Sequence, residues 1–62
     1  MGVSILVIED NPTNLELMTY LLTAFGHTAI RARTGEEGVR LATERVPDLI
    51  LCDIHLPGIN GF

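Results

Sequence analysis

The sequence has no lysine, no tryptophan and only one cysteine among its 62 residues. A single thiol cannot form an internal disulfide, and without a signal-peptide pattern it predicts a reducing, cytoplasmic setting. No apolar run approaches the roughly 18 residues of a membrane-spanning helix, so we expect no membrane association. All four basic residues are arginine and the formal net charge is −4. That balance argues against direct nucleic-acid binding, which normally needs a basic face.

Length and apolar content predict one small globular domain, which we take as residues 1–62. The apolar fraction of 47% is ordinary for a folded domain. A chain this short buries only about 60% of its unfolded surface, so we expect marginal stability.

The first half of the chain predicts a buried strand followed by a helix. Residues 4–8 (SILVI) are apolar without alternation, which is typical of a strand buried on both faces. Asn11 and Pro12 predict a helix start, with asparagine as the N-cap and proline in the first helical position. Gly26 is the expected stop. The predicted apolar face of this helix consists of Leu15, Met18, Leu22 and Phe25, widened by Leu21.

The next segment predicts a half-exposed strand and a shorter helix. Residues 28–33 (TAIRAR) alternate, which places Arg31 and Arg33 on one face. Thr34 and Glu37 fit a capping box at the start of the second helix. Gly38 should weaken that helix by roughly 1 kcal/mol relative to alanine.

After Pro47, residues 48–53 (DLILCD) predict a third strand with a fully apolar core. Cys52 lies inside this run, and we expect it to be a buried core thiol.

The order of elements is therefore βαβαβ, and helices between strands predict a parallel sheet of the α/β class. A strand order of 1-2-3 would put the arginine-bearing strand in the middle of the sheet. An order of 2-1-3 puts it at an edge, and right-handed crossovers then place the two helices on opposite faces. We therefore expect the order 2-1-3.

This order brings three acidic residues to one edge of the sheet. Glu9 and Asp10 follow the first strand, and Asp53 follows the third. Parallel neighbours end at the same edge, where open α/β sheets bind ligands. Three close carboxylates repel one another, and a hard cation such as Mg²⁺ relieves that repulsion.

Three stretches, ILVIEDNPTNLELMTYLL, TGEEG and PDLILCDIHLPGINGF, resemble a response-regulator receiver domain of two-component signalling, which has a flavodoxin-like doubly wound sheet. The resemblance implies that Asp53 accepts a phosphoryl group from a sensor histidine kinase or a phosphotransfer protein. It also implies that Glu9, Asp10 and Asp53 hold Mg²⁺, with the main-chain carbonyl of His55 as a further ligand. Asp10 is the preferred direct ligand of the acidic pair. Such a protein is a phosphoacceptor rather than a turnover enzyme.

The resemblance covers only the first half of a receiver. Receivers have five strands, and in them a hydroxyl residue after the fourth strand and a lysine after the fifth contact the phosphoryl group. This chain stops at Phe62 and contains no lysine. We therefore expect a truncated receiver with impaired phosphoryl transfer.

Other classes fit the residues less well, but one alternative stays open. A toprim-type nuclease would need Asp-x-Asp after a later strand, but the second aspartate of that motif is replaced by His55. A haloacid-dehalogenase-type phosphatase would need Asp-x-Asp after the first strand, where this chain has Glu9-Asp10-Asn11. A dinucleotide or flavin binder would need a glycine-rich or hydroxyl-rich first loop. The open alternative is a non-catalytic structural half-domain. It would form homo-oligomers through its third strand, which lacks a fourth strand beside it.

Overall fold

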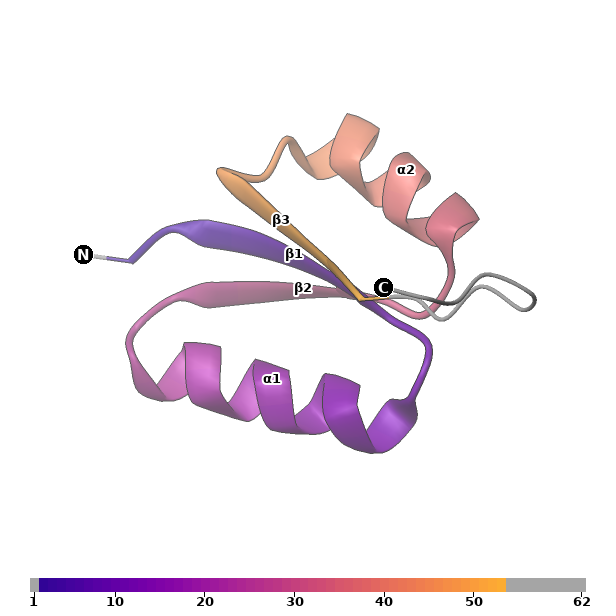
Figure 1. The fold of residues 1–62 in the computed structure, drawn as a ribbon. Coiled ribbons are helices and arrows are strands. Elements are labelled where there is room, and N and C mark those ends of the chain that lie inside the picture. Colours follow the sequence, from indigo (N-terminus) through magenta and orange to yellow (C-terminus); the bar gives the residue numbers. More distant parts are fainter. Residues whose placement is uncertain (1, 54–62) are drawn as a thin grey trace, which may run out of the picture.

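The computed structural model describes residues 2–53, which form a three-stranded parallel sheet with one helix on each face (Figure 1). The elements in chain order are β1 (Ser4–Glu9), α1 (Pro12–Ala24), β2 (Thr28–Ala32), α2 (Gly35–Arg45) and β3 (Leu49–Asp53). The strand order is β2-β1-β3. The predicted βαβαβ pattern and the order 2-1-3 are both confirmed. Neither helix of this described part is long and apolar enough to cross a membrane.

The central strand β1 supplies both cores, because its successive side chains point to opposite faces. On one face Ile5 and Val7 pack with Leu15 of α1. On the other face Leu6 and Ile8 join buried residues of β2 beneath α2. The predicted burial of β1 on both faces and the predicted placement of the helices are therefore confirmed.

The first helix begins as predicted. The Asn11 side chain accepts hydrogen bonds from the backbone N–H groups of Thr13 and Asn14, at 2.9 and 3.1 Å, and Pro12 is the first helical residue. Gly26 follows the helix with φ of +87°. That conformation is freely open only to glycine.

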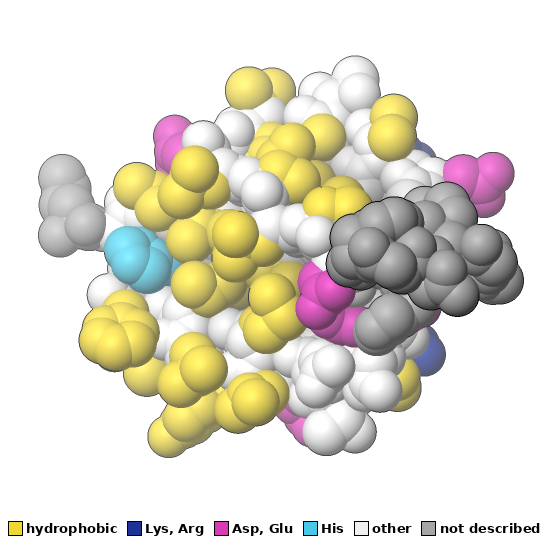
Figure 2. Space-filling model, in the orientation of Figure 1, with side chains coloured by type: hydrophobic (Ala, Val, Ile, Leu, Met, Phe, Trp, Pro, Cys, Tyr) yellow, Lys and Arg dark blue, Asp and Glu magenta, His cyan; other side chains and the backbone are white. Residues whose placement is uncertain are grey.

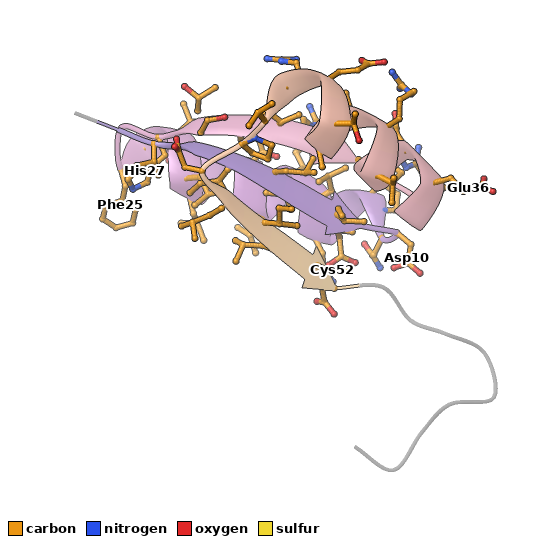
Figure 3. The ribbon with its side chains drawn as sticks, turned by 90° about the horizontal axis from the view of Figure 1, so that it is seen from above. Asp10, Phe25, His27, Glu36 and Cys52 are labelled. Atoms are coloured by element: carbon orange, nitrogen blue, oxygen red, sulfur yellow. The ribbon has the colours of Figure 1, made fainter. Side chains whose placement is uncertain are left out.

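The predicted apolar face of α1 was too wide. Leu15 is buried and Met18 and Leu22 pack beside it, but Phe25 is 77% exposed and Leu21 is also exposed. Phe25 is the C-cap residue, so it lies beyond the last helical turn. Figure 3 shows Phe25 at the end of the molecule opposite Asp10.

The capping box at α2 forms with one difference. The N–H of Glu37 donates to Oγ1 of Thr34 at 3.1 Å, as predicted. The Glu37 carboxylate accepts the N–H of Arg33, at 2.9 Å, rather than that of the cap residue itself. Gly38 is buried, and a Cβ there would lie 2.8 Å from Cγ1 of Ile8. The glycine that weakens the isolated helix therefore lets α2 approach β1 closely.

The third strand differs from the other two. Within residues 2–53, β3 contacts β1 and no other helix or strand, and all five of its residues are exposed. Among residues 2–53, β3 is therefore an edge strand, as expected. The prediction that Cys52 is buried is wrong, because no described element covers the faces of β3.

Candidate functional site

Two of the three predicted acidic residues are partners in the sheet. Glu9 is the last residue of β1 and Asp53 the last of β3, and the parallel register pairs them directly. Asp10 follows Glu9 at the same edge, and Figure 3 shows Asp10 and Cys52 near this end of the sheet. This is the carboxyl end of the strands, at the point where the chain reverses its winding direction.

The Glu9 carboxylate is held in the interior. Glu9 is completely buried (0% exposed), and its Oε2 accepts the backbone N–H of Asn11 at 3.1 Å. Its other oxygen, Oε1, is buried and accepts no hydrogen bond from the described residues. A buried carboxylate oxygen without a partner is unfavourable. A cation or a proton donor placed there would stabilise the site.

The other two acidic residues are exposed to solvent. Asp10 and Asp53 are both exposed. Asp53 ends a strand that no described helix covers, so an incoming reagent can reach its carboxylate. The site therefore combines one fixed, buried carboxylate with an accessible carboxylate on the neighbouring strand. This arrangement suits a nucleophile that needs a cation beside it.

A ready-made metal centre is not present in residues 2–53, because no group of three His, Cys, Asp or Glu side chains there could hold a metal ion. The structure thus pairs Glu9 with Asp53 but does not gather all three acids into one cluster. His55 lies outside the described residues, so its carbonyl ligand stays a prediction.

Sequence reasoning missed the second role of Asn11. This residue was identified as a helix cap, yet its backbone N–H also fixes Oε2 of Glu9. A backbone donor carries no side-chain signal. The only hint in the sequence is its position, two residues after the acid and at the start of the helix.

Comparisons with known proteins support one family. Residues 5–62 match the family model of the response regulator receiver domain. The chain is 43% identical over 58 residues to Protein PilH of Pseudomonas aeruginosa, a match that covers 94% of this chain and 48% of that protein. It is 46% identical over 61 residues to the polar-differentiation response regulator DivK of Brucella ovis, covering 98% of this chain and 50% of that protein. The chain therefore spans about half the length of these relatives.

Proposed function

The chain belongs to the response regulator receiver domain family, and from this premise we propose that Asp53 accepts a phosphoryl group from a phosphohistidine. The donor would be a sensor histidine kinase or a phosphotransfer protein. The observation that carries the proposal is the register pairing of exposed Asp53 with buried Glu9. It gives the acceptor access to solvent and a fixed carboxylate beside it.

The transfer forms one bond and breaks one bond. A carboxylate oxygen of Asp53 attacks phosphorus, and the P–N bond to the donor imidazole breaks. The electron pair stays on the imidazole nitrogen, and the product is an acyl phosphate on Asp53. Such a reaction depends on positioning and on neutralising the charge of the phosphoryl oxygens.

We propose that the cation is Mg²⁺ and that Glu9, Asp10 and Asp53 would hold it, although the described structure pairs only Glu9 with Asp53 and does not gather all three acids. The unpartnered Oε1 of Glu9 supports this assignment, because magnesium prefers oxygen ligands and retains several waters. Bound magnesium would supply positive charge to the phosphoryl oxygens. The N–H of Asn11 keeps the Glu9 carboxylate in place. With so few protein ligands, affinity should be weak.

We further propose that transfer to Asp53 is slow in this 62-residue chain. The sequence contains no lysine, so the phosphoryl oxygens have no lysine ammonium to meet. Losing one such charge-stabilising contact can slow a reaction by two to three orders of magnitude.

Phosphorylation by acetyl phosphate, followed by intact mass, tests the acceptor. In the presence of Mg²⁺ we expect slow, substoichiometric addition of one phosphoryl group, which Asp53→Asn abolishes. Glu36→Gln is the matched control, because it removes one exposed negative charge from the first turn of α2, and it should leave the rate unchanged. Equal labelling of Asp53→Asn would contradict the acceptor assignment. Rapid and stable stoichiometric labelling would contradict the impairment.

Mn²⁺ tests the metal site separately. We expect paramagnetic line broadening in NMR spectra at residues 9–11 and 52–55. Glu9→Gln should weaken the broadening, whereas Glu36→Gln should not. Broadening that spares these residues would exclude the proposed ligands.

A second function, self-association, is favoured by the exposed edge of β3. Leu49, Ile50 and Leu51 are all exposed, and Figure 2 shows hydrophobic side chains gathered across this face of the molecule. An exposed apolar edge strand is a template for pairing with another chain. We propose that the 62-residue chain forms a two-fold dimer through antiparallel β3 strands. This dimer would place the two Asp53 residues at opposite ends of the joined sheet.

Sedimentation equilibrium in reducing buffer, with and without Mg²⁺, tests this dimer. We expect a concentration-dependent mass that Leu51→Lys returns to that of the monomer. Val39→Lys places the same charge at an exposed apolar position of α2, and it should leave the association intact. A monomer at all concentrations, or equal effects of the two substitutions, would contradict pairing through β3.

A further inference from the structure

The position of Asp53 depends on how β3 is held. In the described part of the chain β3 contacts β1 alone, and its five residues are all exposed. No side chain of β3 therefore anchors the strand in a core. Its register therefore depends on its backbone hydrogen bonds to β1 and on the contacts made at the start of the strand.

Asp48, the residue immediately before β3, makes two hydrogen bonds to one residue of β1. Its backbone N–H donates to the carbonyl oxygen of Ser4 at 2.7 Å. Its side-chain Oδ2 accepts the N–H of Ser4, also at 2.7 Å. Ser4 is the first residue of β1, so a single aspartate engages both of its backbone polar groups. A carboxylate acceptor makes this pair stronger than a neutral one.

We propose that Asp48 is a positioning residue for the phosphoacceptor, an inference that rests on the proposed role of Asp53. The two bonds to Ser4 form together only in the register that also pairs Asp53 with Glu9 at the other end of the same strand. A slip of one residue would turn the Asp53 side chain to the opposite face and move it by roughly 3.3 Å. Asp48 holds the strand against that slip.

The start of β2 shows why Asp48 carries more of this task. There the N–H of Thr28 donates to the carbonyl oxygen of Val3 at 2.9 Å, and Nδ1 of His27 accepts the N–H of Val3 at 3.2 Å. Here two residues, His27 and Thr28, share the bonds that Asp48 alone makes before β3, and β2 also buries Ile30 and Ala32 in a core. Burial of one face specifies its register independently. For β3, the described residues bury neither face, so burial does not specify its register.

Three variants test the proposal: Asp48→Ala, Asp48→Asn and Thr34→Ala. The last removes the cap of α2, a helix that contacts β1 and β2 but not β3 within the described residues, so it lowers stability outside the strand that carries Asp53. Two quantities are measured, namely the NOE contacts between Glu9 and Asp53 and the rate of labelling by acetyl phosphate. Urea unfolding gives the stability of each variant. We expect Asp48→Ala to weaken the NOE contacts and to slow labelling by roughly tenfold or more. Asp48→Asn, which keeps an acceptor oxygen, should restore most of both.

The control separates positioning from general stability. Thr34→Ala should lose comparable stability but retain the NOE contacts and the labelling rate. The proposal is overturned if Asp48→Ala keeps the contacts, or if it changes both quantities no more than Thr34→Ala does. If the unmodified chain takes up no phosphate, the proposed function fails, and the NOE contacts alone then decide the role of Asp48.

Discussion

β2 and β3 flank the same central strand in parallel register, yet they are held in different ways. β2 contacts β1 and both helices, and it buries Ile30 and Ala32. β3 contacts β1 alone among the described elements and buries none of its residues. β1, β2 and the two helices therefore form the packed part of the described structure. The strand that ends in Asp53 is attached to that part through one neighbour.

The turns that lead into β2 and β3 also differ, because the turn before β3 has the more strained backbone. The turn into β2 contains Gly26 at φ +87°, and the turn into β3 contains Val46 at φ 44° and ψ 68°. A left-handed conformation is natural for glycine and strained for a β-branched residue. The flank that carries Asp53 thus has both less burial and more backbone strain.

The largest expected effect is the difference in stability between two leucine-to-alanine substitutions, one in β1 and one in β3. Leu6 of the central strand β1 is completely buried in the core beneath α2, whereas Leu51 of β3 is 40% exposed. Leu6→Ala should lower the free energy of unfolding by about 2–5 kcal/mol, enough to unfold so short a chain. Leu51→Ala should lower it by less than about 1 kcal/mol. Urea unfolding followed by circular dichroism measures both, and equal losses would show that the side chains of β3 contribute as much to stability as those of the buried central strand.

Gly26→Ala should have the next largest effect. A Cβ at this position meets no atom within 4 Å, so any loss comes from the backbone conformation alone. We expect a loss of roughly 1–2 kcal/mol in the same urea experiment. An unchanged midpoint would show that this turn can rearrange without cost.

Val46→Gly should act in the opposite direction. Its side chain is exposed, so little burial is lost. Relief of the left-handed strain should outweigh the added freedom of the unfolded chain, for a net gain of roughly 0.5–1 kcal/mol. Val39→Gly makes the same chemical change inside α2 and should destabilise the chain instead. Two changes of the same sign would refute strain at Val46.

The smallest expected effect concerns His27. Loss of the acceptor for the exposed N–H of Val3 in His27→Ala should lower stability by about 0.5 kcal/mol. Hydrogen exchange at Val3 should accelerate, while β2 keeps its register because Ile30 and Ala32 remain buried. A shifted register of β2 would mean that burial does not fix this strand.

The fold could be predicted because its signals are local. An unbroken apolar run marked β1, and Asn11-Pro12 and Thr34 marked the starts of the two helices. The strand order followed from keeping the arginines of β2 at an edge. These features depend on periodicity and capping, which a sequence displays directly.

Burial on the outer side of the sheet could not be predicted in the same way. Cys52 lies in an apolar run, but its exposure depends on which elements cover β3. Phe25 continues the helical spacing of α1 but lies beyond its last turn. An apolar residue shows what could be buried, and only the arrangement of neighbours shows what is.

The site was predicted in part. The meeting of Glu9 and Asp53 followed from strand order and parallel register, and it is confirmed as a pairing. Three features of the site depend on three-dimensional geometry. They are the unpartnered oxygen of Glu9, the hydrogen bond from the Asn11 N–H to Glu9, and the two hydrogen bonds between Asp48 and Ser4. The metal ligands and the phosphoacceptor stay predictions for the experiments above.

Native-state hydrogen exchange in low concentrations of urea tests most directly whether the strand carrying Asp53 is held by β1 alone. We expect the amides that pair β3 with β1 to exchange through a local opening that is nearly independent of urea. Those that pair β2 with β1 should exchange only with global unfolding, at a higher free energy that falls steeply with urea. If both sets exchange with one free energy and one urea dependence, the two flanks form a single cooperative unit, and the distinction between them is wrong.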